Sequence, residues 1–321
     1  MSLVTHETHL NIRPPTFNGE NSLKIHPMHR EPGLNPIHLL HLRRPAWCAW
    51  CEVDPQQKAM LTGGINAAPA APMGGEVSPV QGNTPSIPGR PARPELVHPA
   101  QVPRRAPSTL EGRAALVHSI CHIEFNAINL ALDAVWRFDG MPDQFYLDWA
   151  QVAREEACHF TLLRDHLRAM DVATDVNGQA APRWDYGDFP AHDGLWEMCD
   201  KTAHDVVARM ALVPRTLEAR GLDATPQIQA KLRQVNTPDA LRAVQILDII
   251  LHDEVGHVAI GNHWYAWLCA RDRLDPITHY AVLTERYKAP KMRPPFNLEA
   301  RRRAGFSEVE LAALRPSDRS P

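Results

Sequence analysis

The chain has 321 residues, 44% of them hydrophobic, and its 34 basic and 37 acidic residues give a formal net charge of −3. This composition can bury a substantial core and favours neither a polyanion-binding protein nor a strongly acidic one. The first residues lack the features of a secretion signal, no apolar run approaches the length of a membrane span, and six cysteines are too few for a disulfide framework, so we expect a cytoplasmic protein with no membrane partner.

Proline usage separates the first third of the chain from the rest. Residues 1–107 contain 17 of the 29 prolines, and residues 55–107 are also rich in alanine and glycine. Proline removes a backbone donor and breaks helices. We therefore predict that residues 1–107 form an N-terminal arm that is largely irregular.

The arm contains three His-x-x-His pairs and one Cys-x-x-Cys pair, which could form a second metal site. A polar, histidine-rich tail is the commoner explanation. Two cysteines are too few ligands for structural zinc, and no strand–helix–strand pattern supports a redox motif. Both explanations stay open. The residues are His6 and His9, His26 and His29, His38 and His41, and Cys48 and Cys51.

The first two predicted helices form a pair joined by a short turn. Ser108 is the expected N-cap of the first helix, with Glu111 as its capping-box partner, and the apolar periodicity continues to residue 138. Pro142 opens the second helix, which runs to residue 170. Because the connection is short, the two helices should be antiparallel neighbours.

A connection of roughly 22 residues then leads to a third helix and is long enough to cross from one end of a bundle to the other. The third helix is predicted at residues 193–220, with Gly221 as its stop and a bend at Pro214. After a linker with a short helical stretch, a Thr-Pro pair opens a fourth helix at residues 238–270. Residues 108–270 therefore predict an all-α fold, a ferritin-like four-helix bundle with one long crossover.

Residues 271–321 are predicted to form a short helical C-terminal extension with a basic tail. Such a tail could contact the phosphates of a nucleic acid. No aromatic pattern for base stacking interleaves the charges, so a solvated tail packed on the bundle is the favoured interpretation. The basic residues are Arg286, Lys288, Lys291, Arg293, Arg301, Arg302 and Arg303.

Three of the predicted helices place carboxylates in the middle of an apolar stripe. Glu124 has this position in the first helix. The second and fourth helices each carry Glu-x-x-His, formed by Glu156 with His159 and by Glu254 with His257, and this spacing puts both side chains on one helical face. A buried ionised carboxylate costs several kcal/mol unless it is paired or bound to metal. The recurrence therefore indicates a bound cation.

In the third helix Glu218 is the best candidate ligand, and Glu197, nearer the start, is its competitor. With Glu218, each half of the bundle supplies one Glu followed by one Glu-x-x-His. Oxygen-rich ligation with one imidazole for each ion suits two transition-metal ions, Fe first, with Mn or a mixed Fe/Mn pair as alternatives. The opposing interpretation is a set of buried polar groups satisfied by ordinary hydrogen bonds. The predicted metal ligands are Glu124, Glu156, His159, Glu218, Glu254 and His257.

Residues 88–303 resemble an uncharacterised bacterial ferritin-like family that is defined only as a domain of unknown function. The phrases "PGRPARPELV", "GDFPAHDGLWEM", "ALVPRTLEARGLD" and "DEVGHVAIGN" carry the likeness. The resemblance implies a ferritin-like fold with a di-metal site but no known reaction. More distant relatives include the di-iron hydroxylase that modifies a tRNA base. Residues 1–60 lie outside the resemblance.

The favoured function is a di-metal oxidoreductase that uses dioxygen to hydroxylate or oxidise an unknown small organic substrate, with an electron donor as a further partner. One alternative is a metal-binding or storage protein without organic turnover. Another is an RNA-modifying hydroxylase that uses the basic tail. The long N-terminal arm favours an enzyme, because a lid over a pocket needs extra chain whereas a closed storage shell needs smooth interfaces.

Overall fold

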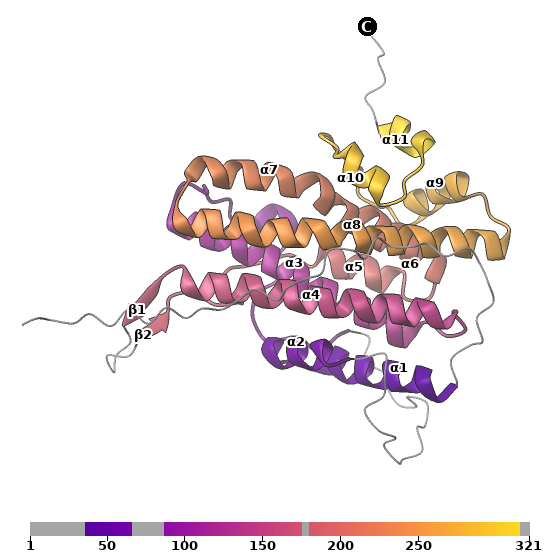
Figure 1. Ribbon diagram of the computed structural model, residues 1–321, viewed down its shortest axis with the longest axis horizontal. Helices are drawn as coiled ribbons and strands as arrows, with labels where there is room; N and C mark the ends of the chain where they lie inside the picture. The colour runs from indigo at the N-terminus through magenta and orange to yellow at the C-terminus, as the bar shows by residue number, and fades with distance from the viewer. Residues whose placement is uncertain (1–35, 66–86, 175–179, 315–321) are drawn as a thin grey trace, which may run out of the picture. The chain divides into compact units, whose positions relative to one another are not determined.

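The computed structural model describes residues 36–65, 87–174 and 180–314 (Figure 1). These residues belong to one compact unit whose regular secondary structure is almost entirely helical, which confirms the predicted all-α class. The exception is a small antiparallel hairpin within the predicted crossover, formed by β1 (Val172–Thr174) and β2 (Ala180–Pro182).

The prediction of an irregular N-terminal arm is wrong for its middle part. Two helices form there, α1 (Pro36–Cys51) and α2 (Pro55–Gly63), and both pack on α3 and α4. Proline is tolerated in the first turn of a helix, where its missing donor is not needed. Asp54 caps α2 by accepting a hydrogen bond from the amide of Gln57 at 2.8 Å, and Trp50 of α1 is fully buried. The irregular prediction holds for the described residues 87–109, apart from a 3₁₀ turn, η1 (Pro99–Gln101).

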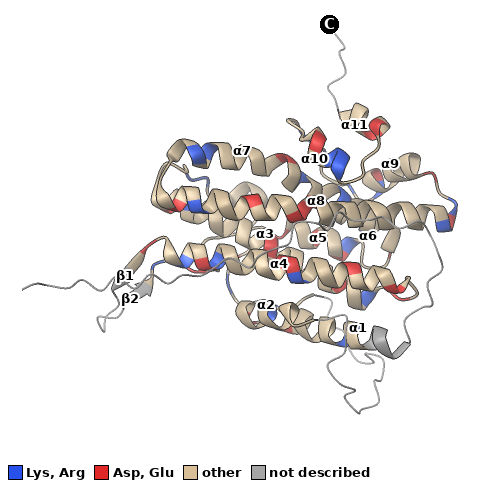
Figure 2. Cartoon of the chain, in the orientation of Figure 1, with Lys and Arg blue, Asp and Glu red and all other residues tan. Residues whose placement is uncertain are grey.

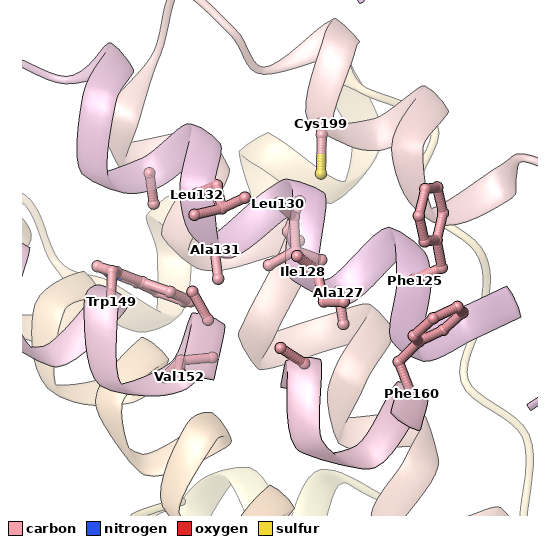
Figure 3. Close-up of a cluster of buried hydrophobic side chains, with 14 of the residues drawn as sticks. Phe125, Ala127, Ile128, Leu130, Ala131, Leu132, Trp149, Val152, Phe160 and Cys199 are labelled. Atoms are coloured by element: carbon pink, nitrogen blue, oxygen red, sulfur yellow. The ribbon is translucent and has the colours of Figure 1, made fainter. Parts of the chain in front are cut away.

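The next two helices, α3 (Leu110–Arg137) and α4 (Asp143–Ala169), confirm the predicted pair. They pack along their apolar faces, and the rings of Phe125 and Phe160 lie 5.6 Å apart at their interface (Figure 3). This interface positions one face of each helix toward the interior, which is the face that carries the predicted ligands.

The N-cap of α3 is Thr109 rather than the predicted Ser108. The hydroxyl of Thr109 accepts a hydrogen bond from the amide of Gly112 at 3.0 Å and donates one to the carbonyl of Ala106 at 3.1 Å. These two bonds fix the second of two adjacent hydroxyl residues as the cap. Glu111 forms an ion pair with Arg105 at 3.1 Å.

Among the described residues, α3 is long and apolar enough to cross a membrane by length and composition, which corrects the expectation that no segment approaches such a length. However, 72% of its most apolar 18-residue window is buried inside the protein. Burial by neighbouring helices is the environment of a core helix in a soluble protein.

The bounds predicted for the third helix are wrong. Gly221 does not end it, because the helix continues until Asn236 adopts a left-handed backbone conformation with φ of 58°. Glycine in a helix interior lowers helix stability by about 1 kcal/mol, and packing against a neighbouring helix can outweigh that cost. The segments here are α5 (Gly194–Lys201), α6 (Val206–Leu212), the π-helix η2 (Val213–Glu218) and α7 (Ala219–Val235).

The predicted disturbance at Pro214 takes the form of the π-helix η2, in whose first turn the proline lies. Proline cannot supply the amide of the regular helical ladder, and π-helical turns are a known way to accommodate a break inside a longer helix. The wider turn changes which side chains face the interior. It therefore bears directly on the orientation of Glu218, the last residue of η2.

The helix α8 (Pro238–Asp272) confirms the fourth predicted helix, with Thr237 at its N-cap position. It lies beside α7 and also contacts α4, α6 and η2 (Figure 1). Gly261 permits the close approach of η2, since a Cβ added there would lie 2.5 Å from the Cβ of Pro214. Through these contacts α8 faces both halves of the helical core.

The predicted C-terminal extension is helical and packs on α6, α7 and α8. Basic and acidic residues both lie along it (Figure 2). Arg301 is buried and lies 2.6 Å from Asp223, so the prediction of a solvated tail is wrong for this residue. Arg302 pairs with Glu299 at 2.9 Å on the surface. The helices are α9 (Pro276–Arg286), α10 (Leu298–Arg303) and α11 (Glu308–Leu314).

Candidate metal centre

The structure brings all six predicted ligand residues into the interior between α3, α4, η2 and α8. Each is buried, with at most 8% of its surface exposed. The competitor Glu197 lies on α5 with its side chain exposed, so Glu218 is the interior carboxylate from this part of the chain. The buried set is Glu124, Glu156, His159, Glu218, Glu254 and His257.

Five of these residues form two groups that share Glu156. In one group it is joined by Glu124 and His159, in the other by Glu254 and His257, and within each group the potential ligand atoms lie within 4.8 Å of one another. The Oε1 atom of Glu156 is 2.9 Å from Nδ1 of His257, and its Oε2 atom is 3.3 Å from Nδ1 of His159. Glu156 thus lies between the two imidazoles and is the carboxylate shared by both groups.

Glu218 stands beside these groups without belonging to either. Both of its carboxylate oxygens are buried and have no hydrogen-bond partner among the described residues. Burial, followed by the negative charge of Glu156, raises the pKa of Glu218 to about 8. The negative charge of the cluster therefore acts on the Glu218 carboxyl group, and both of its oxygens are free to bind a ligand.

Two further carboxylates, which the sequence analysis missed, hold the imidazoles from outside. Nε2 of His159 lies 3.0 Å from Oδ2 of Asp253, and Nε2 of His257 lies 2.8 Å from Oε2 of Glu155. A carboxylate that accepts from Nε2–H leaves the Nδ1 lone pair free to bind a cation. In the sequence, each of these acids directly precedes a Glu-x-x-His, and this position could have identified them. Each acid accepts a hydrogen bond from the histidine of the other helix.

The electrostatics of the cluster favour a bound cation. Burial and then the charge of Glu156 raise the pKa of Glu124 to about 8 and that of Glu254 well above its ordinary range. For Glu156, burial acts to raise the pKa, but the imidazoles of His257 and His159 lower it below its ordinary value. If all four carboxyl groups were ionised, two protonated imidazoles could balance only half of their negative charge, which is why three of the four resist ionisation without a cation. Two divalent cations would neutralise the four carboxylates.

The pKa values of the two imidazole rings also reflect burial on one side and nearby charges on the other. Burial lowers the pKa of both histidines. For His159 the hydrogen bond to Asp253, and for His257 the negative charge of Glu156, outweighs burial and raises the pKa well above its ordinary value. Without a cation, the two rings are therefore the positive charges that the carboxylates attract. A divalent cation would replace those protons and leave the imidazoles neutral.

Several buried polar atoms of the cluster have no hydrogen-bond partner in the described part of the chain. Leaving such an atom unsatisfied costs about 1–3 kcal/mol. The alternative interpretation, in which ordinary hydrogen bonds satisfy these groups, requires partners that the described residues do not provide. The atoms are both oxygens of Glu218 and Oε2 of Glu254. The other ligand atoms face each other, because Oε1 of Glu156 lies 2.9 Å from Nδ1 of His257 and Oε2 of Glu124 lies 3.3 Å from Nδ1 of His159.

The second metal site considered for the N-terminal arm is not formed among the described residues, where the two groups above are the sets of three or more potential ligands. Cys48 is exposed and Cys51 half-buried at the end of α1. Among the histidine pairs, His41 lies within α1. Those at positions 6, 9, 26 and 29, and the side chain at position 38, lie outside the described residues.

A cavity of about 470 Å³ is lined by residues of α2 and α4, among them Gln57, Phe160, Arg164 and Arg168. None of the six predicted ligands lines it. Phe160 follows the candidate ligand His159 in the chain but is part of the cavity wall. The candidate metal centre is therefore a buried cluster distinct from this cavity.

Comparisons with known proteins give similarity without a stated activity. Residues 51–312 match the model of a family described as "Protein of unknown function (DUF455)". An uncharacterized protein from Haemophilus influenzae is 48% identical over 228 residues, which cover 69% of this chain and 74% of the relative. No solved structure matches the chain. The family match includes the predicted resemblance over residues 88–303 and begins further upstream, at the end of α1.

Proposed function

Because the chain belongs to the DUF455 family, whose description states no function, its activity has to be inferred from its own residues, and we propose that it is a di-metal oxidoreductase of the ferritin-like type. The main support for this proposal is that four carboxylates and two imidazoles lie together in the protein interior and that some of the carboxylate oxygens have no hydrogen-bond partner among the described residues. Their order along the chain, one Glu and one Glu-x-x-His in each half, is that of ferritin-like di-metal carboxylate proteins.

The donor set fits two divalent transition-metal ions. Glu124 and His159 would hold one ion, Glu254 and His257 the other, and Glu156 is the carboxylate that belongs to both groups. Glu218 would complete the second half of the centre. Oxygen-rich sites with one imidazole for each ion suit Fe or Mn better than ions that prefer thiolates.

A pair of Fe or Mn ions held by these residues would supply electrons for the reduction of dioxygen while an organic substrate is oxidised or hydroxylated. The chain itself orients the ligands and excludes water. Asp253 and Glu155 fix the two imidazoles from outside. Buried apolar residues one turn away from the ligands, Ile128, Val152 and Ile250, keep the surroundings dry.

Oxygen consumption tests this function against metal storage. The metal-free protein is loaded anaerobically with increasing amounts of Fe(II) and then exposed to oxygen. An oxidoreductase should consume oxygen in proportion to the first two irons per chain and then need an external reductant and an organic substrate. Continued uptake with many retained ferric ions per chain, measured after desalting, would show storage and reject the proposal.

A further inference from the structure

Arg215 in the middle of η2 is fixed by residues that come largely from the C-terminal extension. Its guanidinium lies 4.9 Å from the ring centre of Tyr280 and 5.0 Å from that of Phe306, as well as 5.0 Å from that of Tyr265 in α8. It also forms an ion pair with Glu310 of α11. A planar cation enclosed by aromatic rings and a carboxylate has little freedom to move.

The residue after Arg215 is fixed from the same side. The hydroxyl of Thr216 donates to the carbonyl of Ala211, five residues earlier, at 2.8 Å, and lies 2.8 Å from the hydroxyl of Tyr280. Because a threonine hydroxyl has one hydrogen, Tyr280 must be the donor to Thr216. One tyrosine of α9 therefore contacts two consecutive residues of the π-helix.

A separate apolar cluster joins the extension to the backbone beside the candidate ligands. Ala219 directly follows Glu218, and Val255 and Val258 directly follow Glu254 and His257. These three residues pack with side chains of α10 and α11. The extension thus lies behind the second half of the centre. The partners are Leu222, Ala300, Ala304, Phe306 and Leu311.

We propose that the C-terminal extension, residues 276–314, is a positioning element for Glu218 and hence for the ion held by the second half of the centre, an inference that rests on the proposed di-metal function. A π-helical turn is rare and needs support from its surroundings. A change of one residue in helical register would rotate Glu218 by about 100° around the helix axis. Arg215 and Thr216, held by the extension, prevent that rotation.

Two mild substitutions in the extension test the inference, because replacing the buried Arg215 could unfold the protein. Tyr280→Phe removes the bond to Thr216, and Glu310→Gln weakens the bond to Arg215. The full-length variant carrying both changes is titrated with Co(II), whose visible absorption reports each bound ion. Glu218→Ala identifies the titration step that depends on Glu218. Arg302→Gln is the control, because it alters surface pairs within α10 and between α10 and α11 but no contact with η2.

We expect the double variant to weaken the step identified by Glu218→Ala by about tenfold or more, with the other step within about twofold of wild type. In a Glu218→Ala background the two changes should have little further effect, because they act through that side chain. Unchanged binding, or equal weakening of both steps, would overturn the inference. If wild type itself binds no second ion, the di-metal proposal fails first, so the two failures are distinguishable.

Discussion

Asp253 of α8 accepts a hydrogen bond from Nε2 of His159 in α4 at 3.0 Å, and the two helices repeat this relationship in the opposite direction through Glu155 and His257 at 2.8 Å. Each Glu-x-x-His is therefore oriented by the acid that precedes the other one. The exchange ties α4 to α8 and aims both Nδ1 atoms at the shared carboxylate of Glu156.

This exchange predicts that Asp253→Asn lowers metal affinity about 10–100-fold although Asp253 is not itself a proposed ligand. The neutral amide is a weaker acceptor, so the imidazole becomes less basic and less well oriented. Isothermal titration with Mn(II) measures the effect. Asp272→Asn, at the far end of the same helix, is the matched control and should bind like wild type. Equal affinities for all three proteins would contradict the assigned role.

The third-helix ligand gives a second prediction. Glu218→Ala should lower the metal content after anaerobic reconstitution from two ions per chain to about one, as Glu124→Ala should in the first half of the centre. Glu197→Ala should have no effect, because that side chain is exposed on α5. Metal analysis of the desalted proteins decides between them. Loss of metal in Glu197→Ala with full occupancy in Glu218→Ala would reverse the assignment.

Helical periodicity predicts five of the six candidate ligands, because each of those lies on the buried stripe of a helix. The sixth, Glu218, is favoured over Glu197 by the repeated order of one Glu and one Glu-x-x-His in each half of the bundle. The same periodicity does not predict the roles of Glu155 and Asp253. They lie at the margin of the stripe, with side chains 33% and 27% exposed, where an acid is expected for solubility alone. Their function depends on the proximity of α4 and α8, and a sequence contains no direct measure of that distance.

The missed helices α1 and α2 and the wrong end of the third helix have a common cause in residues that disfavour helix locally. Proline density concealed α1 and α2, although Pro55 occupies a first-turn position where its missing amide is harmless. Gly221 was expected to end a helix that continues to Val235, supported by packing of α7 on α8. Tertiary contacts outweighed local propensity in both places. The π-helical form of η2 likewise depends on neighbours that lie far away in the sequence.

The approach of η2 to α8 predicts a specific cost for Gly261→Ala. The new Cβ would lie 2.5 Å from the Cβ of Pro214, and a proline ring cannot move aside without moving the backbone. We expect a loss of about 1–3 kcal/mol in the free energy of unfolding, together with weaker binding of one metal ion. Urea unfolding and metal titration measure the two effects.

Gly256→Ala is the matched control in the same helix, because a Cβ at that position meets nothing within 4 Å. It should stabilise the protein by roughly 0.5–1 kcal/mol, since alanine favours helix over glycine. If both substitutions behave alike, close packing of η2 on α8 is not what requires glycine at position 261.

Finally, the metal-free protein should lose stability as the pH rises from about 5 to about 8. Burial, then the charge of Glu156, raises the pKa of both Glu124 and Glu218 from an ordinary 4.5 to about 8. Between these values the unfolded chain has released protons that the folded protein retains, so the free energy of unfolding falls, by at most about 1.4 kcal/mol per pH unit for each carboxyl group. The raised pKa values of His159 and His257 act in the same direction, because the stability they contribute is complete below 6.5 and is lost as the pH rises through their folded-state pKa.

Bound Mn(II) should remove most of this pH dependence, because the cation keeps the carboxylates ionised and the imidazoles unprotonated throughout the range. Urea midpoints at intervals from pH 5 to pH 8.5, with and without Mn(II), measure the difference, which should widen as the pH rises. The double substitution Glu124→Gln and Glu218→Gln should flatten the metal-free curve, since it removes two of the groups that titrate. A metal-free protein whose midpoint is constant or rises over this range would refute the assignment of a cation-dependent carboxylate cluster, because buried carboxylates that need a cation must resist ionisation without one.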